Sequence, residues 1–271
     1  MVSWGYKSDH PAHSSFLDYH QTQGTRDFSA FLCIPAALQF MENNNWNQVC
    51  NGALIVASLA IAETDPKYAD EYIPKVIANL PFSNKFYAPD GSWYEGPGYW
   101  AYATEYLSYG MSALQTALGT MKSLETTEGL SKTGFAPMLT TGPTNYIFNF
   151  ADSGENSKGT TSAAMFFMAN TYSNTDISNY LHNYMSATSA LAKPFHVVWY
   201  RSPSNSTPTV PLDHMLKGEL NDLVIMRSSW TDKFATWIGV KSGTNSSPHS
   251  HLDLGSFELD AGGVRWAKDL G

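Results

Sequence analysis

Two histidines and an aspartate alternate in residues 249–253 (HSHLD), after a loop rich in serine and asparagine. In an extended segment, side chains at alternate positions point the same way, so these two imidazoles and this carboxylate are expected to share one face. Such groups bind metal ions or exchange protons near neutral pH. This segment is the strongest single candidate for chemistry in the sequence.

A second candidate is aromatic. Residues 93–102 (WYEGPGYWAY) lead from a loop of turn-forming residues into a helical pattern. Two glycines and a proline among the aromatic residues favour a shaped surface over core packing. Tyr99 and Tyr102 are three residues apart and share one helix face, so a phenol from this face can meet a ligand.

A third candidate is rich in amides. Residues 44–48 (NNWNQ) precede and open a nearly all-apolar segment, residues 46–63, that predicts a buried helix. An asparagine there can simply cap the helix. The alternative is a site for an anion or a carboxylate, because amide donors and the positive end of the helix dipole add at this position.

The elements that must position these segments change in type along the chain. Helical patterns cover residues 28–40, 46–63, 66–80, 99–118, 161–172 and 177–191. Residues 194–216, rich in Pro, Ser and Thr, mark the expected boundary. A short apolar run at residues 223–226 and an alternating pattern at 234–240 predict strands, as do residues 257–259 and 264–266, which flank a glycine hairpin turn at 260–263. We predict an α+β chain: a helical domain over residues 1–195 and an antiparallel β-sheet over residues 196–271.

The composition and net charge of the chain favour some classes of partner and argue against others. The 271 residues are 43% hydrophobic, enough for a sizeable core, and aromatics reach 14% against 15% charged residues, a balance typical of sugar-binding surfaces. The net charge of -8 works against nucleic-acid binding. The longest apolar stretch, residues 53–62, is shorter than the roughly 20 residues of a membrane span. We therefore expect neither a nucleic-acid partner nor membrane insertion.

Three segments together resemble one family. Residues 44–52 (NNWNQVCNG), 90–100 (DGSWYEGPGYW) and 249–257 (HSHLDLGSF) are similar, in this order, to motifs of the heparinase II/III-like polysaccharide lyases, as are residues 227–230 (RSSW) and 263–271 (GVRWAKDLG). The resemblance implies helices of an incomplete α/α toroid followed by an antiparallel β-sheet of a β-sandwich. It also implies that this chain is an internal fragment of that arrangement.

The resemblance implies an activity, β-elimination in acidic, uronate-containing glycans, and a periplasmic or secreted location. It carries catalytic roles to Asn45, which neutralises the uronate carboxylate, to Tyr99 as acid, base or both, and to His249 as a second base or neutralising group. In addition to these catalytic residues, we expect five residues to bind the substrate: Trp46, Trp93, Glu95, Tyr102 and Arg227. Tyr102 is also the alternative to Tyr99. A phenol that acts as a base near neutral pH would need a nearby cation, such as Arg227, to lower its pKa.

The resemblance also implies a structural zinc. The matching ligands are His251 and Asp269, and a third ligand is expected beyond Gly271. No other cofactor is expected.

Two other functions stay open at this point. A glycoside hydrolase on the same helical scaffold would use carboxylates such as Asp90, Glu95 and Asp152 as acid and base. A glycan-binding fragment would hold an oligosaccharide on Trp46, Trp93 and Trp100 without any reaction. The glycan itself, whether alginate, heparan-type, chondroitin-type or another uronan, is not determined, because all of them satisfy the same elimination chemistry.

Overall fold

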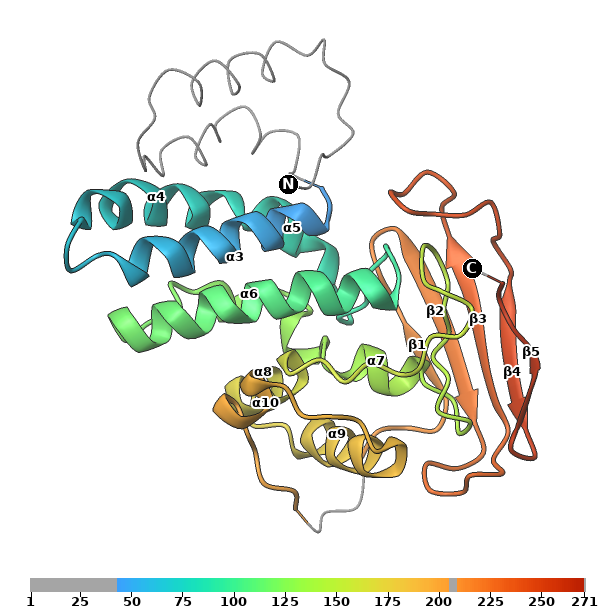
Figure 1. The fold of residues 1–271 in the computed structure, drawn as a ribbon. Helices are drawn as coiled ribbons and strands as arrows, with labels where there is room; N and C mark the ends of the chain where they lie inside the picture. Colours follow the sequence, from blue (N-terminus) through green and yellow to red (C-terminus); the bar gives the residue numbers. More distant parts are fainter. Residues whose placement is uncertain (1–42, 205–208, 271) are drawn as a thin grey trace, which may run out of the picture.

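The computed structural model describes residues 43–204 and 209–270. Figure 1 shows a helical part standing beside one β-sheet, with three long helices, α3 (Asn45–Ala60), α4 (Pro66–Asn79) and α6 (Pro97–Leu118), running alongside one another. This arrangement confirms the predicted α+β class. The helix predicted over residues 28–40 lies outside the described residues.

The smaller helical elements connect and cover the long helices. They are α5 (Pro81–Asn84), η2 (Lys85–Tyr87), η3 (Leu124–Thr126), η4 (Leu130–Lys132), α7 (Phe135–Thr140), α8 (Ala164–Thr171), α9 (Thr175–Thr188) and α10 (Pro194–Val198). The sequence patterns missed α7, which is too short for its period to show. They also treated the start of 194–216 as irregular, whereas Pro194 opens the short helix α10.

Helices α3 and α6 pack closely because small residues face each other between them. A Cβ added to Gly52 would lie 2.2 Å from the carbonyl oxygen of Tyr106, and one added to Gly110 would lie 3.1 Å from the Cα of Gly52. Such close contact aligns the two helices and places their first turns at the same end, toward the sheet (Figure 1). The first turns carry Asn45 and Tyr99, which are therefore brought near each other.

The sheet is antiparallel throughout, in the order β1-β2-β3-β4-β5. Its strands are β1 (His214–Leu216), β2 (Asn221–Arg227), β3 (Trp237–Gly243), β4 (Phe257–Ala261) and β5 (Val264–Ala267). The predicted hairpin turn between β4 and β5 is confirmed, with Gly262 and Gly263 at positive φ. Strand β3 begins later than predicted: Phe234 is exposed and precedes it, while Trp237 and Lys241 point to the buried face.

The buried face of the sheet packs against residues 139–151. Leu139, Phe148 and Phe150 form a core with Leu223, Ile225 and Trp237 of the sheet. The opposite face is also apolar at matched positions, since Val224 pairs with Val240 and Met226 with Ile238. A separate, larger core fills the helical part. None of the described helices is long and apolar enough to cross a membrane.

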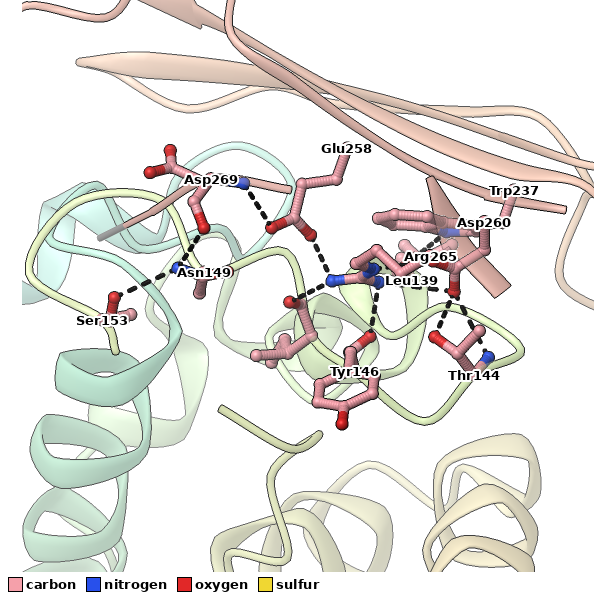
Figure 2. A network of polar contacts seen from close by, with 11 residues as sticks. Leu139, Thr144, Tyr146, Asn149, Ser153, Trp237, Glu258, Asp260, Arg265 and Asp269 are labelled. Carbon is pink, nitrogen blue, oxygen red and sulfur yellow. Dashed lines mark hydrogen bonds and ion pairs between the residues drawn. The ribbon is translucent and has the colours of Figure 1, made fainter. Parts of the chain in front are cut away.

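Polar contacts also fasten residues 139–149 to the sheet (Figure 2). Arg265 bonds Asp260 and Glu258 of β4, and it donates to the carbonyl oxygens of Tyr146 and Ile147. Asp260 in turn accepts from the backbone and the hydroxyl of Thr144. The loop that follows, residues 150–153, is thus held on a fixed support, and it carries Asp152 toward the first turns of α3 and α6.

Candidate active site

The candidate residues meet where the first turns of α3 and α6 approach residues 150–153 and the loop between β3 and β4. Helix α3 begins at Asn45, after Asn44, whose Oδ1 accepts the backbone N–H of Trp46 at 2.9 Å. Helix α6 begins at Pro97, after Gly96, whose φ is positive (92°). A Cβ on Gly96 would lie 2.6 Å from the carbonyl oxygen of Phe150, so only glycine permits this close contact with the 150–153 loop.

A buried carboxylate, Glu95, joins the start of α3 to the aromatic segment. Its Oε2 accepts the backbone N–H of Asn45 and the indole N–H of Trp93, each at 2.9 Å. Its Oε1 accepts the side-chain amide of Asn45 at 3.2 Å. Asn45 and Glu95 are both fully buried, so this part of the site is closed to solvent.

The accessible part of the site contains an aspartate between two histidines. Asp152 Oδ2 lies 2.5 Å from His249 Nδ1, and Oδ1 lies 3.0 Å from His251 Nε2. The ring of His249 stacks on that of Tyr99, with centroids 4.0 Å apart and an interplanar angle of 22°. His249 Nε2 lies 3.9 Å from Glu95 Oε1. His249 thus connects the accessible group to the buried one.

The loop that carries both histidines is anchored below the site. Lys241 of β3 is almost fully buried, and its Nζ lies 2.5 Å from Asp253 Oδ1. The backbone of Lys241 also bonds Ser256 and Gly255. His249 itself has a left-handed backbone (φ 58°), which costs energy in a non-glycine residue. The residue whose ring stacks on Tyr99 thus lies in a loop whose later part, residues 253–256, is held against β3 by Lys241.

Burial and two anions act on the phenol of Tyr99. Burial raises its pKa, and the carboxylates of Asp152 and Glu95 raise it further. Burial also raises the pKa of Glu95, although the donors Asn45 and Trp93 oppose that shift. The bonds from His249 and His251 lower the pKa of Asp152. The site therefore keeps Tyr99 protonated near neutral pH and Asp152 ionised.

The expected role of Arg227 is not supported by its position. Its guanidinium donates to the carbonyl oxygens of Leu139 and Thr141 at 2.9 and 3.0 Å and lies over the ring of Trp230. The charged groups that act on Tyr99 are carboxylates, and Arg227 is not among them. Arg227 fastens the end of α7 to the sheet. Arg227 is therefore not the nearby cation that a basic phenol would need, and the pKa of the Tyr99 phenol is raised.

Other expected substrate-binding residues divide by exposure. Trp93 and Glu95 are buried and bond each other, so neither offers a surface to a sugar in this structure. Trp46 and Tyr102 are each 38% exposed. Tyr102 packs edge-to-face on Tyr106, whereas Tyr99 stacks on His249, which favours Tyr99 over Tyr102 as the reacting phenol. Trp46 keeps the exposure that a stacking platform requires.

The predicted zinc ligands do not form a metal site in the described part of the chain. His251 Nε2 faces Asp152, and the backbone of Asp269 bonds Glu258 and Asn149. No group of three or more His, Cys, Asp or Glu residues suited to a metal ion occurs within residues 43–204 and 209–270. Two ligands are too few to hold the ion, and the third ligand was expected outside the described residues. Zinc at His251 and Asp269 therefore stays a prediction.

The sequence patterns missed the partnership of Asp152 with the two histidines. Asp152 stood out only as a carboxylate that a hydrolase could use, in the irregular segment FNFADSG. Its bond to His249 spans 97 positions of the chain. Nothing in the local pattern indicates such a contact, because it depends on how residues 139–149 lie against the sheet.

The carboxylates do not form the pair that a glycoside hydrolase requires. The imidazole of His249 stands between Glu95 and Asp152, where a sugar and a water would have to fit. Asp90 lies elsewhere and accepts hydrogen bonds from Lys132 Nζ at 2.8 Å and from the backbone N–H of Lys217 at 3.2 Å. The arrangement instead suits proton transfer by an imidazole and a phenol beside an amide.

Comparison with known proteins supports the fold. No known protein family matches the chain, and no curated protein matches its sequence. Among solved structures, the chain is similar to one described as "Crystal Structure of Heparinase III", with a TM-score of 0.64 and 14% sequence identity over 94% of this chain. The chain spans 41% of the length of that protein. The match confirms the predicted heparinase-like fold and, at this identity, shows the fold alone.

Proposed function

We propose that this protein is a polysaccharide lyase that cleaves acidic, uronate-containing glycans by β-elimination. The observation that carries the proposal is the meeting of Asn45, Tyr99 and His249, which are far apart in sequence, around Glu95 and Asp152. The heparinase-like fold supports the reaction class, together with the resemblance of residues 44–52, 90–100 and 249–257 to motifs of polysaccharide lyases. A periplasmic or secreted location is part of the proposal.

The reaction divides between two groups. His249 takes the proton from the carbon next to the uronate carboxylate. The electron pair left behind forms a carbon–carbon double bond as the bond to the glycosidic oxygen breaks, and the phenol of Tyr99 donates a proton to that oxygen. No water is consumed in this step. Asp152 bonds Nδ1 of His249, which leaves Nε2 of the neutral ring as the base.

The environment of Tyr99 supports its role as the acid. A phenol whose pKa is raised by burial and by Asp152 and Glu95 remains protonated near neutral pH and can give up its proton only as negative charge develops on the leaving oxygen. A phenol pKa lowered by a nearby cation, such as Arg227, would instead have favoured Tyr99 as the base.

Besides a base and an acid, the reaction requires a donor that neutralises the uronate carboxylate. We assign this role to Asn45. An amide nitrogen has two N–H groups, of which one bonds Glu95 in this structure. The second is the donor that we assign to the substrate. Because Asn45 is fully buried, its contact with the substrate requires the side chains around it to move. No step of the reaction runs through a metal ion.

Mass spectrometry of the small products tests the proposal. The protein is incubated with a panel of polyuronates, including alginate, heparan-type and chondroitin-type glycans. Elimination gives products one water lighter than hydrolysis, with an unsaturated terminal sugar, and the reacting glycan identifies the substrate. The variant His249→Ala serves as the control for contaminating enzymes. Hydrated products, or the same unsaturated products from this variant, would contradict the proposal.

A second candidate, glycan binding without reaction, is favoured by one observation, the complete burial of Asn45. In that case Trp46 and Tyr102 would hold the sugar, since Trp93 and Trp100 are buried. Oligosaccharide binding seen by calorimetry, with no product of any kind, would support this candidate over the lyase.

A further inference from the structure

Glu95 is an unusual carboxylate because the groups that hydrogen-bond it are neutral. It is fully buried, and it accepts three N–H groups: two from Asn45 and one from Trp93. An ionised carboxylate in the interior is costly unless several donors bond it. The closeness of the donors shows that this carboxylate is a built part of the site, in which both oxygens already accept N–H groups of the protein.

Two of the three donors belong to the same residue, and this decides what Glu95 does. One oxygen accepts the backbone N–H of Asn45 and the other accepts its side-chain amide. The backbone and the side chain of Asn45 are therefore held by one rigid group. An ionised carboxylate only accepts hydrogen bonds, so it binds the NH₂ side of the amide and turns the oxygen away. Asn45 Oδ1 is indeed buried with no hydrogen-bond partner among the described residues.

We propose that Glu95 is a positioning residue that fixes the orientation of the Asn45 amide, so that its second N–H is the group offered to the substrate carboxylate. The kinetic consequence rests on the proposed lyase function. The clamp itself, one carboxylate holding two N–H groups of Asn45, does not. Trp93 contributes by bonding the same oxygen that holds the backbone of Asn45.

The variant Glu95→Gln tests the orientation because it has the same shape and a different hydrogen-bond pattern. If the Gln oxygen keeps the two bonds of Oε2, its NH₂ group faces the NH₂ group of Asn45. Two donors cannot bond each other, so the Asn45 amide turns over and presents its oxygen to the Gln. The substrate carboxylate then meets a different face of the amide, without any loss of buried volume.

The first measurement is kinetic. Glu95→Gln is expected to lower kcat about 100-fold, the size of the effect of losing one oriented donor, while KM changes less than about threefold. Glu71→Gln, an exposed carboxylate on α4 that pairs with Lys75, is the matched control and should match the wild type. A Glu95→Gln enzyme with wild-type kcat would overturn the kinetic part of the proposal.

The second measurement needs no activity. Asn45→Asp places a second carboxylate against Glu95 and is expected to lower Tm by about 5 to 10 °C. In the Glu95→Gln background the new carboxylate can accept from the Gln amide, so the same change should lower Tm by less than half as much. Equal decreases in both backgrounds would show that the two side chains are not coupled, and would overturn the clamp.

A third measurement covers the case in which Glu95→Gln fails to fold. In the wild-type protein the side-chain amide of Asn45 and the indole N–H of Trp93 should exchange with solvent slowly, at rates seen by NMR to be at least about tenfold below those of exposed amides. Fast exchange at Asn45 would overturn the clamp. If the wild type cleaves no polyuronate while the stability cycle shows coupling, the lyase function fails and the clamp stands.

Discussion

The two halves of the candidate site are built in opposite ways. The buried half, Asn45 and Glu95, lies within the packed helical part and is held by N–H donors at short range. The accessible half, Asp152 with His249 and His251, has side chains 29 to 48% exposed and depends on contacts between loops. Exposed contacts contribute little to stability, whereas an unpaired buried polar group is costly. Changes in the buried half should therefore affect folding and activity together, and changes in the accessible half should affect activity alone.

The largest expected effect is at Tyr99, whose ring stacks on His249, the residue that connects the two halves. Tyr99→Phe keeps the ring on His249 and removes the proton donor, so turnover is expected to fall about 1,000-fold with little change in Tm. Steady-state kinetics and a thermal melt check this result. Tyr106→Phe, on the same helix, is the control and should retain turnover, while an equal loss in Tyr102→Phe alone would move the acid role to Tyr102.

A second prediction concerns the support beneath the accessible half. Burial raises the pKa of Glu258 to about 7 from an ordinary 4.5, against the opposing charge of Arg265. Because the folded protein holds this proton more tightly than the unfolded chain, the stability from Glu258 is complete below about pH 4.5 and is lost as pH rises through 7. The loss amounts to roughly 3 kcal/mol.

Urea unfolding at pH 5 and pH 8 tests this prediction. Glu258→Gln keeps a neutral group at every pH, so the difference in unfolding free energy between the two pH values should shrink by about that amount relative to the wild type. Asp260, Asp269 and Arg265 also face this group and are present in both proteins, so the comparison isolates the change made at Glu258. An identical pH dependence in the variant would show that Glu258 does not titrate in this range.

The third prediction tests the accessible half directly. Asp152→Asn removes the charge that bonds both histidines and is expected to lower turnover about 10- to 100-fold, because His249 loses its orientation, with Tm unchanged within about 2 °C. Asp90→Asn is the matched control, a carboxylate paired with Lys132 outside the site. A loss in Asp90→Asn as large as that in Asp152→Asn would contradict the role assigned to Asp152.

The smallest effect is expected at the surface. Trp46→Ala removes an exposed ring beside Asn45 and should raise KM about 3- to 10-fold with kcat nearly unchanged, as for the loss of one stacking contact. Kinetics over a series of oligosaccharide lengths checks this expectation. A fall in kcat without a change in KM would place Trp46 in the chemical step instead.

Much of the fold could be predicted from the sequence, because it depends on local periodicity. The helical patterns over residues 46–63 and 99–118 correspond to α3 and α6, and the alternating patterns correspond to strands of the sheet. The glycines of the β4–β5 turn could be recognised because their conformation is a local property of the chain. Helix α7 and the start of β3 could not, because a few residues do not reveal a period.

The sequence by itself determined which residue types were available for chemistry: an amide at the start of a helix, phenols on one helix face and alternating histidines. Only the tertiary structure decided their partners. Trp93 and Glu95 became buried supports, Arg227 became a fastener between α7 and the sheet, and Asp152 joined His249 across 97 positions. The physical reason is that periodicity fixes which side chains share a face, whereas contacts between distant segments depend on how the sheet closes against the helices.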